Sequence, residues 1–174
     1  MRELMVVDVE ENDFSGEVCG ATSVRCITWR EGRVLLEYSN LYDYFRFPGG
    51  AVAEGESSEA ALAREVRRES GYVVKPDSVK EFGQVSCKCK NEDSKESISE
   101  ETILYYECEI EPVPEPVEYD ENENKEGFIA IWMNPLVAAD NNRDSVKKSR
   151  GANPALVERE ERVLRILAGD IKIG

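Results

Sequence analysis

Two glutamates one helical turn apart, Glu65 and Glu69, are the residues of this sequence best suited to chemistry. They lie in the segment 57–70, SSEAALAREVRRES, which is rich in helix-forming residues, opens with serines that can cap a helix and is followed by Gly71. At about 100° per residue, the two side chains leave one flank of that helix roughly 40° apart. Two carboxylates on one flank could bind a hard cation such as Mg²⁺, which prefers oxygen ligands and shares them with phosphate.

A third carboxylate can join this pair, because Glu56 lies in the loop before the helix and can fold back toward the same flank. Like charges one turn apart cost a few tenths of a kcal/mol, so a cation or an arginine must compensate them. The plain alternative is an exposed helix whose glutamates pair with its own arginines at little gain per pair. A bound metal would instead neutralise phosphate charge and lower the pKa of an attacking water.

The stretch from Gly50 to Tyr72 resembles the signature of the Nudix hydrolase family, G-x5-E-x7-R-E-U-x-E-E-x-G-U, in which U is a bulky apolar residue. The matching positions are Gly50, Glu56, Arg64, Glu65, Val66, Glu69, Gly71 and Tyr72. Arg68 departs from the pattern, since it replaces the first of two adjacent glutamates. A match this long, in a strand-loop-helix context, is far more specific than a lone glycine motif.

The resemblance implies Mg²⁺-dependent hydrolysis, with Mn²⁺ as a possible substitute, of a diphosphate bond in a nucleoside diphosphate linked to another moiety. It implies that Glu65 and Glu69 ligate the metal, that the carbonyl of Gly49 completes the coordination and that Arg64 orients the carboxylates. It also implies a base or extra ligand from a downstream loop, for which the sequence offers Glu100, Glu101, Glu118, Glu123 and Glu126. Glu126 is favoured because it directly precedes an apolar strand.

Arg68 also supports a competing interpretation, a catalytically impaired domain that binds a nucleotide as a sensor or interaction module. Its guanidinium would lie about 60° around the helix from Glu65, where it can contact phosphate or pair with a glutamate. A side chain turned away from Glu65 and Glu69 would leave room for a metal, whereas one held between them would argue for its loss. Arg25 and Arg46, on strands before the motif, could bind substrate or be polar residues of half-exposed strands.

The elements around the motif predict an α/β (α+β) fold, a Nudix-like α/β/α sandwich with a mixed sheet. Segments 23–29 and 34–38 predict a hairpin around Gly32, and 44–47 a strand that ends at Pro48. Segments 78–90, 101–110 and 127–133 predict further strands, separated by polar loops at 91–100 and 111–127. Asn153 and Pro154 predict the start of a closing helix over 154–168, within a single domain 1–174 whose first 20 residues form an N-terminal extension.

Composition narrows the possible partners. With 36 acidic and 22 basic residues, the formal charge of −14 would repel polymeric nucleic acid, whereas a metal on clustered carboxylates could still attract a small nucleotide-like diphosphate. No apolar run approaches the roughly 20 residues of a membrane span, and the acidic N-terminus is unlike a secretory signal, so we expect a cytoplasmic location and no membrane partner. The five cysteines are expected to be reduced, and a homodimer is possible.

Overall fold

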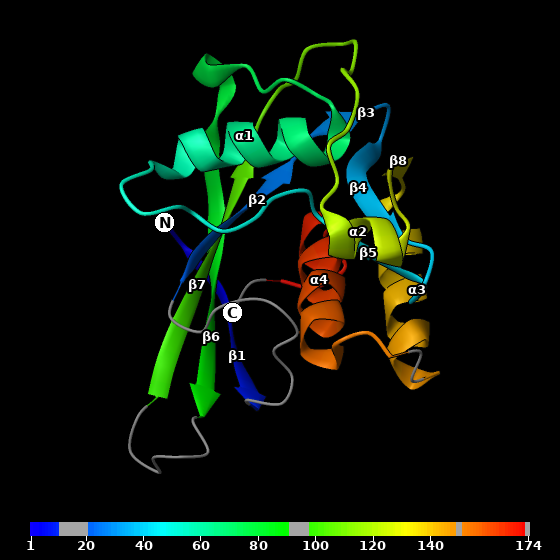
Figure 1. Cartoon of the computed structure of the whole chain (residues 1–174). Helices are drawn as coiled ribbons and strands as arrows, with labels where there is room; N and C mark the ends of the chain where they lie inside the picture. Colours follow the sequence, from blue (N-terminus) through cyan, green and yellow to red (C-terminus); the bar gives the residue numbers. More distant parts are fainter. Residues whose placement is uncertain (11–20, 91–97, 149–150, 173–174) are drawn as a thin grey trace.

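The computed structural model describes residues 1–10, 21–90, 98–148 and 151–172, which form two four-stranded sheets with helices on both sides (Figure 1). The first sheet has the order β1 (Glu3–Glu10), β6 (Lys80–Lys90), β7 (Ile98–Glu107) and β2 (Thr22–Ile27). Its β1–β6 and β2–β7 pairs are parallel and its β6–β7 pair is antiparallel, so the sheet is mixed as expected. The second sheet is antiparallel and consists of β3 (Trp29–Arg30), β4 (Arg33–Ser39), β5 (Tyr44–Arg46) and β8 (Phe128–Met133).

Helices cover the strands from two sides, which confirms the predicted α/β/α arrangement. The helices are α1 (Ser58–Ser70), α2 (Glu121–Glu126), α3 (Pro135–Lys147) and α4 (Pro154–Leu167), with a 3₁₀ turn η2 (Pro76–Ser78). In Figure 1, α1 lies across β2 and β7, whereas α3 and α4 run side by side. Val24 and Cys26 of β2 pack in a core with Leu62 of α1, while Ile27 packs in a second core with Leu164 of α4.

The predicted hairpin strand 23–29 is divided between the two sheets at Thr28. Ile27 still accepts a hydrogen bond from the backbone N–H of Cys108 after β7, whereas Thr28 accepts one from Leu35 of β4. β2 therefore belongs to the first sheet, and only Trp29–Arg30 pair with β4 as the hairpin. The strands predicted over 78–90, 101–110 and 127–133 appear as β6, β7 and β8 with small shifts of their ends.

Three elements were not expected from the sequence. Residues 3–10, taken as part of an extension, form β1, and Leu4 is buried in the core. The segment 111–127, predicted to be a solvated loop, ends in α2, whose start Asp120 caps with Glu123 in a capping box. Helix α3 begins at Asn134 and Pro135, the same cap and first position that correctly predicted α4 at Asn153 and Pro154.

Buried polar groups of α3 and α4 hold the strand that leads into the signature. Asn142 of α3 accepts from the backbone N–H of Phe45 at 2.7 Å and donates to its carbonyl oxygen at 2.8 Å. Glu160 of α4, with no exposed surface, accepts from the N–H of Phe47 at 2.9 Å and from the hydroxyl of Tyr105 at 3.1 Å. These contacts fix the backbone on both sides of Arg46.

Three of the five cysteines have described side chains, and all three are buried. Cys26, Cys87 and Cys108 are buried thiols that form no disulfide, and the sulfurs of Cys26 and Cys108 lie 3.1 Å apart. Cys19 and the side chain of Cys89 lie outside the described residues. Within the part of the chain that the structure describes, no helix is long and apolar enough to cross a membrane.

Candidate active site

Helix α1 carries Glu65 and Glu69 on a buried flank. The helix starts where the Ser57 hydroxyl accepts from the N–H of Ala60 at 3.2 Å, and it ends at Gly71, whose φ of 75° is left-handed. Because Leu62 and Val66 are fully buried against the strands, the neighbouring flank is drawn inward, and Glu65 and Glu69 are only 7% and 1% exposed. The alternative of an exposed helix face is therefore wrong for these two glutamates, although they do pair with arginines of their own helix, Arg64 and Arg68, as that alternative expected.

The glycine turn before the helix lies directly against the two carboxylates. The N–H of Gly49 donates to Glu69 Oε2 at 2.7 Å, and a Cβ at Gly50 would lie 2.8 Å from Cδ of Glu65. Gly49 has a φ of 146°, and a Cβ there would overlap the carbonyl oxygen of Val24. Gly49 is thus required for the turn to approach the backbone of β2, and Gly50 for the turn to approach the carboxylate of Glu65.

Arg46 of β5 lies at the centre of a cluster of carboxylates. Its Nε donates to Glu37 of β4 at 2.7 Å, and its Nη2 donates to Glu69 of α1 and Glu123 of α2, each at 3.1 Å. Its guanidinium carbon also lies 4.0 Å from the ring centre of Phe128. Carboxylates from three separate elements, and a ring from β8, therefore meet at one arginine whose side chain is 17% exposed.

Arg68 is held between the glutamates of α1. Its Nε donates to Glu65 at 2.8 Å, and its Nη2 donates to Glu69 at 3.1 Å. It also donates to both carboxylate oxygens of Glu123, at 2.5 and 2.9 Å. We call Glu37, Glu65, Glu69 and Glu123, with Arg46 and Arg68, the carboxylate cluster.

Arg64 links the cluster to the loop before the helix. It donates to Glu65, to both carboxylate oxygens of Glu56 at 2.8 Å, and to the carbonyl of Ala51 at 3.1 Å. This arginine holds the pKa of Glu56 at about 2, so Glu56 is ionised at neutral pH. Glu56 folds back as expected, but it contacts Arg64 rather than the other carboxylates.

Burial gives the carboxylates of the cluster unequal proton affinities. Desolvation raises the pKa of Glu69 well above its usual value, and the charge of Glu37 adds to the effect. Desolvation also raises the pKa of Glu37, with Arg46 opposing it. Burial acts in the same sense on Glu123, but hydrogen bonds from Arg68 and the N–H of Asp120 prevail and lower the pKa of Glu123 to about 2.

Two residues expected at the site from sequence lie elsewhere or beside it. Arg25 is buried and lies in register with Tyr105, on the face of β2 opposite Val24 and Cys26, so it points away from α1. Glu126 lies one turn beyond Glu123 on α2, where it accepts from Ser39 at 3.3 Å and from Tyr44 at 3.5 Å. Burial raises the pKa of Glu126.

Two members of the cluster were not singled out from the sequence. Glu123 was one of five downstream candidates, and its place depends on α2, which was not expected. Glu37 interrupts the apolar run VLLEY and faces Arg46 in the β4–β5 register. A charged residue in an apolar strand, opposite a charge of the other sign on the next strand, is the signal that could have identified it.

The oxygen atoms of the carboxylate cluster suit a hard divalent cation, although they are not arranged as a preformed metal site. Among the described residues, no three histidine, cysteine or carboxylate side chains converge on a point that could hold a metal ion. The four carboxylates and two arginines of the cluster nevertheless leave a formal charge of −2, all donors are oxygens, and one oxygen of Glu37 has no hydrogen-bond partner. A cation could join Glu65 and Glu69 once Arg68 moves away.

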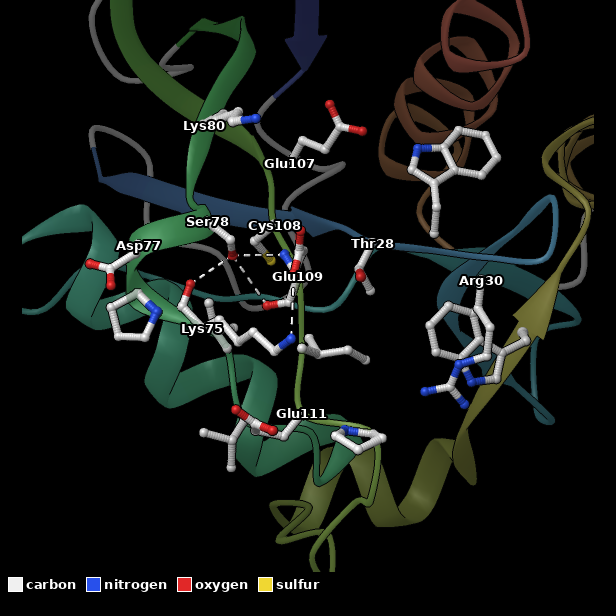
Figure 2. A pocket seen from close by; sticks show the side chains of 17 residues that line it. Thr28, Arg30, Lys75, Asp77, Ser78, Lys80, Glu107, Cys108, Glu109 and Glu111 are labelled. Atoms are coloured by element: carbon white, nitrogen blue, oxygen red, sulfur yellow. Dashed lines mark hydrogen bonds and ion pairs between the residues drawn. The ribbon is translucent and has the colours of Figure 1, made fainter.

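A separate pocket of about 1150 Å³ lies beyond the C-terminal end of α1 (Figure 2). Its walls include Arg30, Lys75, Glu109 and Trp132, and none of the residues of the carboxylate cluster. The guanidinium carbon of Arg30 lies 4.3 Å from the ring centre of Trp132, and Lys75 pairs with Glu109 at 3.4 Å. Lys75 is thus paired within the protein. Arg30 is stacked on Trp132 and donates to the hydroxyl of Tyr72 at 3.3 Å, so the pocket gives no indication of a particular ligand.

Comparison with known proteins gives one family match and several similar folds. A family model described as NUDIX domain matches residues 21–151. The MutT protein of Bacillus halodurans aligns with a TM-score of 0.54 and 23% identity, over 70% of this chain and 72% of that chain. The ORF135 protein of E. coli aligns with a TM-score of 0.55 and 19% identity, over 87% of this chain and 94% of that chain.

A NUDIX hydrolase from Nitrosomonas europaea aligns with a TM-score of 0.55 and 16% identity, over 86% of this chain and 89% of that chain. At these identities the solved structures establish a shared fold alone. A search of curated proteins finds no match.

Proposed function

Because this chain belongs to the NUDIX domain family, a family of pyrophosphohydrolases, we propose that it hydrolyses the diphosphate bond of a small nucleotide-like substrate with the help of Mg²⁺. The observation that supports this most is the burial of Glu65 and Glu69 against the Gly49–Gly50 turn. There, the two carboxylates are shielded from water, and they lie beside a turn whose close approach leaves no room for a side chain at either glycine. Such an arrangement costs stability, and binding a cation and a phosphate is a function that would justify it.

In this proposal, Glu65 and Glu69 hold the metal, with the carbonyl of Gly49 and Glu56 as the further expected ligands. Mg²⁺, when bound, neutralises diphosphate charge and lowers the pKa of a coordinated water. Arg64 holds Glu65 and Glu56 in place through its fork of donors. Arg46 donates a hydrogen bond to Glu69 at 3.1 Å and so holds this carboxylate in position. We therefore assign Arg46 a positioning role rather than contact with substrate.

Glu126 remains the proposed base, with Glu123 in a positioning role. A base works best when its pKa lies near the working pH. Burial raises the pKa of Glu126, whereas the pKa of Glu123 is about 2 and both its oxygens accept from Arg68. Glu126 is therefore the better proton acceptor of the two.

The cytoplasmic location and the homodimer that were expected from the sequence stay predictions.

A second candidate function is nucleotide binding without turnover. The contacts of Arg68 with Glu65 and Glu69 favour it, because this is the arrangement that argues for loss of the metal. In that case Arg68 would serve as the permanent counterion of the cluster. The domain would bind a nucleotide diphosphate and release it unchanged.

Turnover assays separate the two candidates. Phosphate and nucleotide release would be measured on nucleoside triphosphates, nucleotide sugars, ADP-ribose and dinucleotides, with Mg²⁺ and with EDTA. We expect Mg²⁺-dependent turnover that falls at least about 100-fold in Glu65→Gln and in Glu126→Gln. Glu59→Gln, an exposed position on the same helix, should leave it unchanged. Nucleotide binding with no turnover of any substrate would establish the second candidate instead.

A further inference from the structure

We propose that Arg68 is a built-in counterion that competes with the divalent cation for Glu65 and Glu69, and so sets the metal affinity of the free protein. This inference rests on the proposed function, because it concerns the same site. It adds that the chain's own departure from the Nudix signature controls when the site can load. Arg68 would thus determine the metal concentration at which the protein works.

The contacts of Arg68 are those of a cation inside its binding site. One guanidinium spans three carboxylates from two helices, with four donor-to-oxygen distances between 2.5 and 3.1 Å. It also donates to the carbonyl of Glu118 at 3.3 Å. Its side chain is 27% exposed, while the carboxylates that it bridges are at most 9% exposed. The guanidinium therefore lies over the outer side of the buried carboxylates.

The neighbouring arginine provides a natural contrast. Arg67 lies on the same turn of α1, but its side chain is 60% exposed and it pairs only with Glu115, at 2.7 Å, among the contacts of the described residues. Two adjacent arginines of equal charge thus differ in whether they touch the carboxylate cluster. Of these two arginines, only Arg68 donates to the oxygens of Glu65 and Glu69. The charge of the exposed Arg67 acts on a bound cation only from a distance, where salt screens it.

Competition follows from the charges. A cation that binds Glu65 and Glu69 must break the Arg68 hydrogen bonds to both, and it must tolerate a guanidinium in contact distance until that side chain turns outward. Removal of Arg68 eliminates both costs and leaves the carboxylates with a larger negative excess. Arg46 still holds Glu69 from the inner side, so the site would keep its shape.

Mn²⁺ binding to the metal-free protein tests this without any substrate. The dissociation constant would be measured by electron paramagnetic resonance and titration calorimetry for wild type, Arg68→Ala and the matched control Arg67→Ala. We expect at least tenfold tighter binding in Arg68→Ala, and a change of less than twofold in Arg67→Ala. Equal affinity in the two variants would overturn the inference.

Two further variants guard against a folding defect and identify the site. Arg68→Lys keeps the charge but loses the planar fork, so its Mn²⁺ affinity should fall between wild type and Arg68→Ala. Arg68→Ala with Glu65→Gln should lose the gain, which would assign the bound ion to this site; a retained gain would contradict the inference. Lack of turnover by wild type would refute the proposed hydrolysis alone, since the affinity comparison does not depend on catalysis.

Discussion

At the scale of single residues, the signature positions were predictable but their partners were not. Spacing alone placed Glu65 and Glu69 on one flank of a helix, and they lie there. The burial of that flank depends on strands β4 and β5 and on α2, which bring Glu37, Arg46 and Glu123 to it. The local sequence does not show which side chains from distant segments come into contact. The carboxylate cluster could therefore be identified only from the tertiary structure.

Arg46 should matter for stability more than any exposed arginine. Arg46→Met removes the charge that Glu37, Glu69 and Glu123 share and leaves buried carboxylates unpaired, so we expect a loss of about 3–5 kcal/mol in the free energy of unfolding. Arg33→Met, on the exposed start of β4, should change it by less than about 0.5 kcal/mol. Urea unfolding in EDTA measures both; similar values for the two variants would contradict the central role of Arg46.

At the scale of elements, prediction succeeded where a local signal was strong. Helices α1 and α4 carry caps, helix-forming residues and closing glycines, and their predicted ends agree with the structure to within a residue or so. Helix α3 carries the same Asn-Pro start as α4 but follows an apolar strand without a break, which hid it. Strand β1 pairs with β6, about 80 residues further along the chain, and helix α2 has only six residues, so neither carries a strong local signal.

Gly71 illustrates why the signature requires glycine after the helix. Gly71 and Gly32 have nearly the same φ, 75° and 74°, but a Cβ at Gly71 would overlap the carbonyl oxygen of Glu115, whereas Gly32 has open space around it. Gly32→Ala should therefore cost only the backbone strain, about 1–2 kcal/mol. Gly71→Ala should lower the free energy of unfolding by about 1–3 kcal/mol more than Gly32→Ala, because the backbone at Glu115 must move. Thermal and urea unfolding would compare them, and equal losses would rule out the close approach as the cause.

At the scale of the whole molecule, the layered architecture was predictable because apolar periodicity reports which faces are buried. The distribution of charge was not. Neither Glu37 nor Glu160 was expected from the sequence to be buried, yet Glu37, Glu69 and Glu160 are among the most buried side chains of the described residues. Burial of acidic side chains should make the free energy of unfolding fall as the pH rises.

Metal-free protein should become less stable as the pH rises above the ordinary glutamate pKa of 4.5. Burial raises the pKa values of Glu37 and Glu69, so between 4.5 and those values the folded state binds more protons than the unfolded state. The free energy of unfolding then falls with rising pH. Glu123 acts oppositely: its pKa of about 2 gives stability that is present above 4.5 and lost as the pH falls toward 2.

The substitution Glu37→Gln tests this dependence. It removes one of the groups whose pKa is raised, and it should flatten the decline in the free energy of unfolding above pH 4.5, measured by urea unfolding in EDTA. The exposed Glu31→Gln should preserve the wild-type slope. An unchanged slope in Glu37→Gln would show that its carboxylate does not carry the effect.

The parallel strand pairs have a consequence for how the protein folds. Thr22 lies opposite Thr102 and Glu3 is in register with Gln84, so each pair joins residues about 80 positions apart along the chain. The hydrogen bonds that Arg46 donates to Glu123 and that the N–H of Phe47 donates to Glu160 likewise join residues far apart along the chain. Nucleation must bridge long loops, which slows the acquisition of structure.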